Sequence, residues 1–380
     1  MYIRGSMRIG INTRFLLSTK MEGFGWYTFE VVKRLVQNHP EHEFVFFFDR
    51  AYDERFIFAK NVTPVVLFPP ARHPFLFLWW FEISVKKALK KHKIDLFFSP
   101  DGYVSLGATT KQIAVIHDLN FEHNPTDIPP VARWYLRRYF PKFARKAAAI
   151  ITVSEFSKKD IVETYRIAPN KITVAWNGAS SAFQPISEEK KVIVRTQYSN
   201  KKPYFLFVGA LHPRKNLPNL LRAFHEFSQT NQAIDLIIAG SELWKNNSFD
   251  TTFLTEKTKQ RIHFTGHVPL ATLTDLMGAA YALVYVPYFE GFGIPLVEAM
   301  RCGIPIIAGN KTALPEVIGA AGLLVDPHNV SAITTQMHAL ADNDSLHKEL
   351  SEKSFERSKL FSWDDSAAIV WRTIEAIYNQ

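Results

Sequence analysis

The stretch from Tyr285 to Val317, YVPYFEGFGIPLVEAMRCGIPIIAGNKTALPEV, constrains the fold more than any other part of the chain. An apolar run at 282–286 leads into a polar, glycine-containing turn, and a short helix is predicted to begin near Gly293 or Ile294. A second apolar run at 304–308 completes a strand–turn–helix–strand unit, which is the building block of a parallel sheet. Because ligands bind at the carboxyl ends of such strands, we expect this turn to lie at a binding site.

Two glutamates flank the predicted helix start. Glu290 and Glu298 are separated by seven residues. The free backbone N–H groups at a helix start attract an anion such as phosphate. A carboxylate is poorly suited to hold phosphate, but it readily accepts hydrogen bonds from sugar hydroxyls. The turn is therefore predicted to combine a place for phosphate with two acceptors for hydroxyl groups.

This segment resembles the donor-site signature of retaining family-4 glycosyltransferases with the GT-B fold, EGFG-(I/L)-P-x-x-E-A-M-x-C-G-x-P. The matching residues are Glu290, Gly291, Phe292, Gly293, Pro295, Glu298, Ala299, Met300, Cys302, Gly303 and Pro305. The resemblance implies that Glu298 holds the ribose hydroxyls of a nucleotide and that Glu290 holds hydroxyls of the transferred sugar. It also places Gly291, Phe292, Gly293, Ile294 and Leu296 against the donor.

A second motif follows the predicted strand 204–208. Gly209 begins the sequence GALHPRKN, which places Arg214 and Lys215 in a turn before a helix. A diphosphate needs such cations, both to bind and to leave as an anion. The pattern is similar to the diphosphate-binding element of the same family. In that family the main chain after a later strand recognises the nucleotide base, which implies His267 and Val268 here.

The first half of the chain contains a weaker glycine motif. Residues 13–25 are predicted to form a loop before a helix at 26–38, and the sequence GFGWYT lacks the full GxGxxG fingerprint of a dinucleotide site. The resemblance implies that Gly23, Gly25 and Tyr27 contact the acceptor or the donor. The alternative is a tight turn that needs glycine only for its backbone.

His117 and Asp118 follow the predicted strand 111–116. A polar pair at the end of a strand is well placed for a ligand, although an ordinary surface pair is the alternative. The resemblance implies that His117 lies against the transferred sugar and that Asp118 is its neighbour. Further along, Ser154 is predicted to cap a helix, with Ser157 three residues later.

A chain of 380 residues predicts two domains. The polar, proline-containing stretch 177–204 is the best candidate for a linker. We predict an α/β protein with domains at 1–180 and 181–362. The resemblance implies that both are doubly wound, Rossmann-like domains facing across a cleft, the first binding the acceptor and the second the donor. The resemblance implies that the C-terminal helix, 363–380, crosses back to the first domain and packs there through Trp363 and Trp371.

Charge is distributed unevenly. Residues 1–171 contain 26 Lys and Arg against 16 Asp and Glu, a net charge of +10, whereas the remainder has a net charge of −1. A basic half indicates an anionic partner.

Two segments of this half are candidates for contact with a membrane. Aromatic residues followed by lysines at 73–93 are typical of a membrane-surface element. A second candidate is 133–146, which Pro141 is expected to interrupt. The alternative is two amphipathic helices packed on their own sheet. No nucleic-acid-binding motif is recognised.

The single cysteine, Cys302, excludes an intramolecular disulfide. No apolar run is long enough to span a bilayer, and the N-terminus lacks the layout of a signal peptide. We expect a cytoplasmic protein. Because the N-terminal half is basic, a peripheral position at the inner face of the membrane is also considered. Residues 1–6 are either a cloning remnant or a natural extension.

The predicted reaction is transfer of a sugar from a nucleotide diphosphate sugar to a hydroxyl of a glycan or lipid-linked glycan, with retention of anomeric configuration. No cofactor or metal is expected, because Arg214, Lys215 and the helix start near Gly293 can stabilise the leaving group. Resemblance of HDLNFEHNP and of 138–161 to bacterial polysaccharide mannosyltransferases favours GDP-mannose. The alternatives are a UDP-sugar-dependent transferase, a UDP-sugar epimerase and an inactive sugar-binding subunit.

Overall fold

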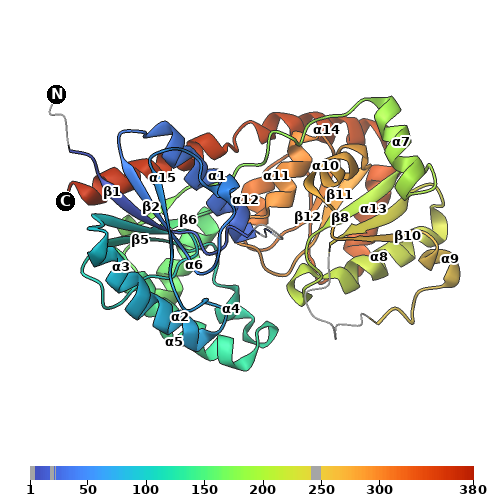
Figure 1. Cartoon of the computed structure of the whole chain (residues 1–380). Helices are drawn as coiled ribbons and strands as arrows, with labels where there is room; N and C mark the ends of the chain where they lie inside the picture. The colour runs from blue at the N-terminus through green and yellow to red at the C-terminus, as the bar shows by residue number, and fades with distance from the viewer. Residues whose placement is uncertain (1–4, 18–20, 22, 241–249) are drawn as a thin grey trace. The chain divides into compact units, whose positions relative to one another are not determined.

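The computed structural model describes residues 5–17, 21, 23–240 and 250–380. Of the N-terminal stretch 1–6, residues 1–4 lie outside the described residues. Contacts divide the chain into two compact units: residues up to 177 together with 362–380 form the first, and residues 178–361 form the second. Each unit is an α/β structure built on its own parallel sheet (Figure 1).

The first unit contains a seven-stranded parallel sheet in the order β3-β2-β1-β4-β5-β6-β7. Its strands are short and largely buried, as expected for a parallel sheet covered on both faces. Their bounds are β1 Arg8–Asn12, β2 Glu43–Phe48, β3 Val62–Val66, β4 Leu96–Ser99, β5 Lys111–Val115, β6 Ala149–Thr152 and β7 Ile172–Val174.

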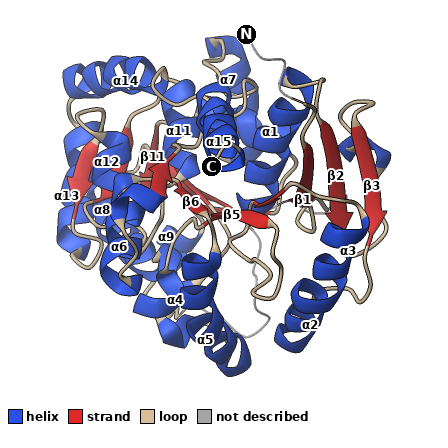
Figure 2. Cartoon of the chain, turned by 90° about the vertical axis from the view of Figure 1, so that its left-hand side faces the viewer, coloured by secondary structure: helices blue, strands red, loops and turns tan. Residues whose placement is uncertain are grey.

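Helices cover both faces of this sheet, with α1 and α15 on one side and α2, α3 and α5 on the other (Figures 1 and 2). The α-helices are α1 Gly23–Asn38, α2 Pro74–Trp79, α3 Lys86–Lys91, α4 Asn120–His123, α5 Pro130–Lys146, α6 Glu155–Tyr165 and α15 Trp363–Tyr378. A π-helical segment, η2 Trp80–Val85, joins α2 to α3, and short 3-10 turns occur at Glu54–Phe56, Pro125–Asp127 and Pro169–Lys171.

The second unit contains a six-stranded parallel sheet in the order β10-β9-β8-β11-β12-β13. The strands are β8 Tyr204–Val208, β9 Asp235–Ala239, β10 Ile262–Gly266, β11 Ala282–Tyr285, β12 Ile306–Gly309 and β13 Leu323–Val325. The helices are α7 Glu188–Tyr198, α8 Leu217–Thr230, α9 Glu256–Lys259, α10 Leu270–Ala279, α11 Ile294–Arg301, α12 Leu314–Ile318, α13 Val330–Ala341 and α14 Asp344–Ser358, with a 3-10 turn at Pro213–Lys215.

The core of the second unit explains why its central elements form. Phe205 and Phe207 on β8 are fully buried, and they pack in one cluster with Phe224 and Phe227 of α8. The aromatic residues of α8 recur at helical spacing, so a single face of that helix carries them toward the sheet. This packing fixes the end of β8 and the start of α8, between which the predicted diphosphate motif lies.

Three expectations from the sequence are wrong in detail. The stretch 177–204 is not simply a linker, because Ser187 caps α7, which lies within it, by accepting a hydrogen bond from Lys190 N. Helix α1 begins at Gly23 rather than at residue 26, so both predicted loop glycines lie in its first turn. Pro141 does not interrupt α5, which runs continuously through it.

The C-terminal helix packs on the first unit, as predicted. The Trp371 ring stacks on the His39 ring with centroids 3.5 Å apart, and Trp363 meets Tyr27 edge-on. An ion pair between Arg34 of α1 and Asp364, 2.6 Å long, also joins the two helices. None of the helices in the described ranges is both long and apolar enough to cross a membrane.

In each sheet there is one position from which successive strands are added first toward one edge and then toward the other. That position lies between β1 and β4 in the first unit and between β8 and β11 in the second. Ligands of doubly wound sheets bind beyond the carboxyl ends of the strands at this position. The segments that follow β8 and β11 are therefore the favoured place for a ligand in the second unit.

Candidate active site

The two predicted cations follow the carboxyl end of β8. Arg214 and Lys215 end the 3-10 turn, and His212 caps it by accepting a hydrogen bond from Arg214 N. The next residue, Asn216, is buried in a left-handed conformation, and its amide donates to Val286 O at 2.9 Å and to Pro327 O at 2.7 Å. Asn216 therefore anchors the turn to the segment after β11, so both motifs reach the same edge of the sheet.

Glu290 joins the two motifs. Its carboxylate oxygen Oε1 accepts hydrogen bonds from Arg214 Nη1 at 2.9 Å and from Lys215 Nζ at 2.5 Å. Arg214 Nη1 also donates to Phe289 O at 3.2 Å. The main chain of Glu290 is held as well, because its N–H donates to Thr312 Oγ1. The structure thus brings together Arg214, Lys215 and Glu290, which lie about 75 positions apart in the sequence.

Tyr285 is a member of this cluster that the sequence interpretation missed. Lys215 Nζ donates to its hydroxyl at 2.5 Å, and that hydroxyl also hydrogen-bonds Glu290. Tyr285 is the last residue of β11 and is fully buried. A tyrosine within a buried apolar strand needs a partner for its hydroxyl. The position of Tyr285 in the apolar run 282–286 could therefore have indicated that it belongs to a polar site.

Electrostatics keep this cluster charged. Burial alone would raise the pKa of Glu290, but Arg214 and Lys215 outweigh it and lower the pKa below the usual value. Burial and the nearby Glu290 raise the pKa of Tyr285 well above its usual value, so its hydroxyl stays neutral. The site therefore presents two cations, one carboxylate and one neutral hydroxyl.

Helix α11 supplies the second half of the signature. It begins after Gly293, whose φ of +93° and close approach to Leu314 exclude a side chain, since a Cβ would lie 2.8 Å from that residue. Phe292 is buried and meets Phe361 edge-on, and Leu296 is fully buried in the first turn. Gly291 is buried and Ile294 is partly buried. These residues shape the helix start.

Glu298 lies one turn further along α11 and is partly buried. Burial raises the pKa of its carboxyl group to about 8. The carboxyl group is therefore mostly protonated at neutral pH. In this form it both donates and accepts a hydrogen bond, whereas ionisation would turn it into an acceptor only.

The raised pKa of Glu298 predicts a pH dependence of stability. Because the folded-state pKa lies above that of the unfolded chain, Glu298 contributes stability below about pH 4.3, the usual glutamate value, and loses it as pH rises toward about 8. Over that window we expect the wild type to lose unfolding free energy relative to Glu298→Gln, measured by urea denaturation. Glu352→Gln, an exposed change on α14, should track the wild type. Parallel pH profiles for the wild type and Glu298→Gln would contradict the assignment.

The remaining predicted donor residues lie at the same edge of the second sheet. Gly209 follows β8 with φ +148°, and Lys215 lies directly against it. His267 and Val268 follow β10 and are exposed and partly buried, respectively. Their predicted role, recognition of the nucleotide base through the main chain, stays a prediction.

In the first unit, His117 and Tyr27 come together. Their rings meet edge-on with centroids 4.7 Å apart, and the hydroxyl of Tyr27 is buried without a partner among the described residues. His117 Nε2 lies 2.8 Å from Pro100 O. Since a carbonyl only accepts, the proton resides on Nε2 and Nδ1 is left as an acceptor. Burial lowers the pKa of His117, which keeps the ring neutral.

The other predicted residues of the first unit have local structural roles. A Cβ on Gly25 would lie 2.8 Å from Phe15 O, so the close backbone approach requires glycine there. Gly23 starts α1 in open space. Asp118 accepts a hydrogen bond from Asn120 N at the start of α4. Ser154 accepts one from Ser157 N at 3.0 Å, which confirms the predicted helix cap.

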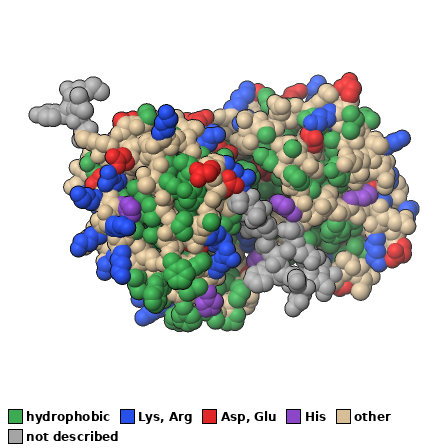
Figure 3. Space-filling view, viewed as in Figure 1, with side chains coloured by type: hydrophobic (Ala, Val, Ile, Leu, Met, Phe, Trp, Pro, Cys, Tyr) green, Lys and Arg blue, Asp and Glu red, His purple; other side chains and the backbone are tan. Residues whose placement is uncertain are grey.

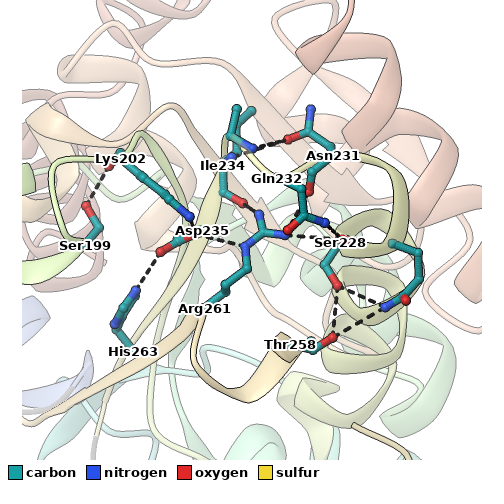
Figure 4. Close-up of polar contacts among 12 residues, drawn as sticks. Ser199, Lys202, Ser228, Asn231, Gln232, Ile234, Asp235, Thr258, Arg261 and His263 are labelled. Carbon is teal, nitrogen blue, oxygen red and sulfur yellow. Dashed lines mark hydrogen bonds and ion pairs between the residues drawn. The ribbon is translucent and has the colours of Figure 1, made fainter. Parts of the chain in front are cut away.

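A second charged cluster lies at the opposite, amino-terminal edge of the second sheet (Figure 4). Asp235, the first residue of β9, accepts hydrogen bonds from Arg261 Nε at 3.1 Å and from His263 Nε2 at 2.9 Å. Arg261 also donates to the carbonyls of Ser228 and Asn231. Burial opposes ionisation of Asp235, but His263 and Arg261 outweigh it and lower its pKa. This cluster joins the starts of strands, away from the edge where ligands bind.

Among the described residues, no group of three or more His, Cys, Asp or Glu side chains is arranged to hold a metal ion. The arrangement after β8 and β11 instead offers cations for a diphosphate and carboxyl groups for hydroxyls. This combination suits a nucleotide diphosphate sugar, in which an anion and a polyol are joined.

Comparison with known proteins agrees with this chemistry. The family described as Glycosyl transferases group 1 matches residues 189–357, and the family described as Glycosyltransferase Family 4 matches residues 21–183. Together they cover most of both units. The chain is a glycosyltransferase. The resemblance found in the EGFG…EAM segment is thereby confirmed at the level of the family.

Two curated relatives and one solved structure illustrate the similarity. The glycosyltransferase is 27% identical over 357 residues to O-antigen chain mannosyltransferase B of Escherichia coli, covering 91% of the chain and 93% of that protein. It is 29% identical over 216 residues to O-antigen chain mannosyltransferase RfbU of Salmonella typhimurium, covering 57% of each. The crystal structure of WaaG, a glycosyltransferase involved in lipopolysaccharide biosynthesis, matches with a TM-score of 0.76, 16% identity and coverage of 95% of this chain and 99% of that one. The two parallel sheets thus belong to a GT-B fold, as predicted.

Proposed function

We propose that this glycosyltransferase transfers mannose from GDP-mannose to a hydroxyl of a glycan or lipid-linked glycan in the synthesis of a bacterial surface polysaccharide. The clustering of Arg214, Lys215 and Glu290 at the carboxyl edge of the second sheet carries the proposal of a nucleotide diphosphate sugar. The choice of mannose is supported by two relatives that are named as O-antigen mannosyltransferases.

The proposed chemistry retains the anomeric configuration and uses no metal. The bond between the anomeric carbon and the diphosphate oxygen breaks while the acceptor oxygen bonds to the same face of that carbon. The acceptor proton passes to the departing phosphate, whose negative charge Arg214 and Lys215 stabilise. Glu298 holds the ribose hydroxyls, and Glu290 orients the sugar. A double displacement would need a carboxylate nucleophile, and Glu290 is a poor one because two cations share its oxygen.

Thermal stability measured with GDP, UDP, ADP and their sugars tests this proposal. We expect GDP and GDP-mannose to raise the melting temperature, because ligands that bind only the folded state stabilise it. Stabilisation by UDP and a UDP-sugar alone would indicate the alternative donor, and conversion of a UDP-sugar without an acceptor would indicate an epimerase. Binding without transfer would indicate an inactive sugar-binding subunit. No response to any nucleotide would contradict the proposal.

We also propose that the first unit binds the surface of an anionic membrane. Large apolar side chains are exposed on α2, η2 and α5, and these helices contact one another. Figure 3 shows such side chains gathered in the region that α2 and α5 occupy in Figure 1, with Lys and Arg nearby. Aromatic and aliphatic groups beside lysines and arginines are suited to insert among acidic headgroups. The exposed apolar residues are Phe75, Leu76, Trp79, Ile83, Val131 and Trp134, and the exposed cations on α3 and α5 include Lys86, Lys87, Lys90, Lys91, Arg137 and Arg138.

Replacement of both Trp79 and Trp134 by serine is expected to weaken binding to vesicles that contain phosphatidylglycerol by at least about tenfold, because each tryptophan buries a large apolar surface in the interface. Vesicle sedimentation at two salt concentrations measures the affinity and its electrostatic part. Phe355→Ser, which changes an exposed aromatic of the second unit, is the matched control. Equal binding by the double variant and the wild type would exclude this surface, and binding to duplex DNA instead would indicate a nucleic-acid partner.

A further inference from the structure

The two cations of the site share one counter-ion. Arg214 Nη1 and Lys215 Nζ both donate to the same oxygen of Glu290, at 2.9 and 2.5 Å. The Glu290 side chain is buried, as is Lys215. Charges that are removed from water in this way interact more strongly than charges on an exposed surface. The carboxylate therefore offsets part of the positive potential that a diphosphate would experience.

Glu290 is also held firmly in place. The hydroxyl of Tyr285 bonds both Lys215 and Glu290, and the main-chain N–H of Glu290 is tied to Thr312. A diphosphate that binds at Arg214 and Lys215 would therefore lie beside a fixed negative charge, which is unfavourable.

The repulsion between the Glu290 carboxylate and the ligand differs between substrate and product. In an intact nucleotide sugar, hydroxyls of the sugar can donate to Glu290, and this offsets the repulsion. A free nucleoside diphosphate lacks those hydroxyls, and its terminal phosphate carries additional negative charge because that phosphate has a second ionisable oxygen. The same carboxylate thus attracts one ligand and repels the other.

We propose that Glu290 determines specificity for the intact nucleotide sugar over the free nucleoside diphosphate and thereby speeds release of that product. This inference rests on the proposed function, because it takes the diphosphate to bind at Arg214 and Lys215. Glu290 would then have two effects: it binds the hydroxyls of the sugar in the substrate, and it repels the free nucleoside diphosphate that is the product.

The test compares dissociation constants of Glu290→Gln and wild type, by titration calorimetry, for the nucleoside diphosphate that stabilises the wild type and for its sugar derivative. Loss of the carboxylate is expected to tighten binding of the free diphosphate by at least about tenfold. Binding of the intact donor should change less or weaken, and product inhibition should become stronger. Disruption of the fold would weaken both ligands, so the sign of the change separates repulsion from a structural role.

Two further variants complete the experiment. Glu290→Asp keeps the negative charge and should keep the wild-type affinity for the free diphosphate to within about threefold, even where contact with the sugar is lost. Glu352→Gln removes an exposed carboxylate of the same unit and should change neither affinity. Equal or weaker binding of the diphosphate to Glu290→Gln would overturn the inference. Failure of the wild type to bind any nucleoside diphosphate would instead overturn the proposed function.

Discussion

Replacement of Lys215 by methionine is expected to lower kcat/KM by about 100- to 1,000-fold, the usual effect of removing one preorganised group that stabilises developing negative charge. Lys215 is buried, and its ammonium group is fixed by Tyr285 and Glu290. Methionine retains much of the length and apolar character of the lysine stem, so packing should change little while the charge is lost. Release of nucleoside diphosphate from the donor identified by thermal stabilisation measures the effect.

Lys190→Met is the matched control for this variant. Lys190 pairs with Asp275 at 2.5 Å, but its side chain is half exposed and it lies on α7, outside the cluster of Arg214, Lys215, Tyr285 and Glu290. Exposed pairs contribute about 1 kcal/mol or less, so both activity and stability should remain close to those of the wild type. A Lys215→Met variant that kept more than about a tenth of the wild-type kcat/KM would exclude leaving-group stabilisation by this residue.

The two central strands of the second sheet were predictable because each is a continuous apolar run followed by a glycine-containing turn. The run 204–208 and the run 282–286 each correspond to a strand within one residue, and the predicted helix start at Gly293 or Ile294 agrees with α11. The clustering of Arg214 with Glu290 could also be anticipated in part, since each follows a strand and carboxyl ends of parallel strands meet at one edge.

Pairings between distant residues were not predictable in the same way. The bond between Lys215 and Glu290 joins residues 75 positions apart, and the predicted roles assigned one to phosphate and the other to sugar. The composition of 177–204 indicated a linker because polar residues predominate, yet capping by Ser187 starts a helix there. In both cases the deciding interaction depends on side-chain geometry, about which composition and periodicity contain no information.

The clearest such case is a buried ion pair in the first unit, which no sequence pattern indicated. Arg14 Nε donates to Asp101 Oδ2 at 2.6 Å, and both residues are 5% exposed. They follow β1 and β4, between which the strand order of this sheet reverses. This is the position equivalent to that of Arg214 and Glu290 in the second unit. Both units place an ion pair there, Arg14 with Asp101 in the first and Arg214 and Lys215 with Glu290 in the second.

Replacement of Asp101 by alanine is expected to lower the free energy of unfolding of the first unit by about 3–5 kcal/mol, because it leaves a buried arginine without its counter-ion. Burial opposes the charge of Arg14, and Asp101 outweighs this to raise the arginine pKa. Asp101 also accepts hydrogen bonds from Asn12 and Ser99, which would lose their partner. The Tyr103 ring lies 4.3 Å from the guanidinium carbon and would offset part of the loss.

Urea unfolding followed by tryptophan fluorescence measures this change mainly in the first unit. Seven of the eight tryptophans belong to that unit, and only Trp244 falls within residues 178–361. The control is Glu43→Ala, which breaks the exposed pair between Glu43 and Arg8 and should cost about 1 kcal/mol or less. A double variant in which Arg14→Met accompanies Asp101→Leu should recover much of the stability, since it removes both buried charges. If Asp101→Ala lost no more than Glu43→Ala, the pair would not stabilise the first unit.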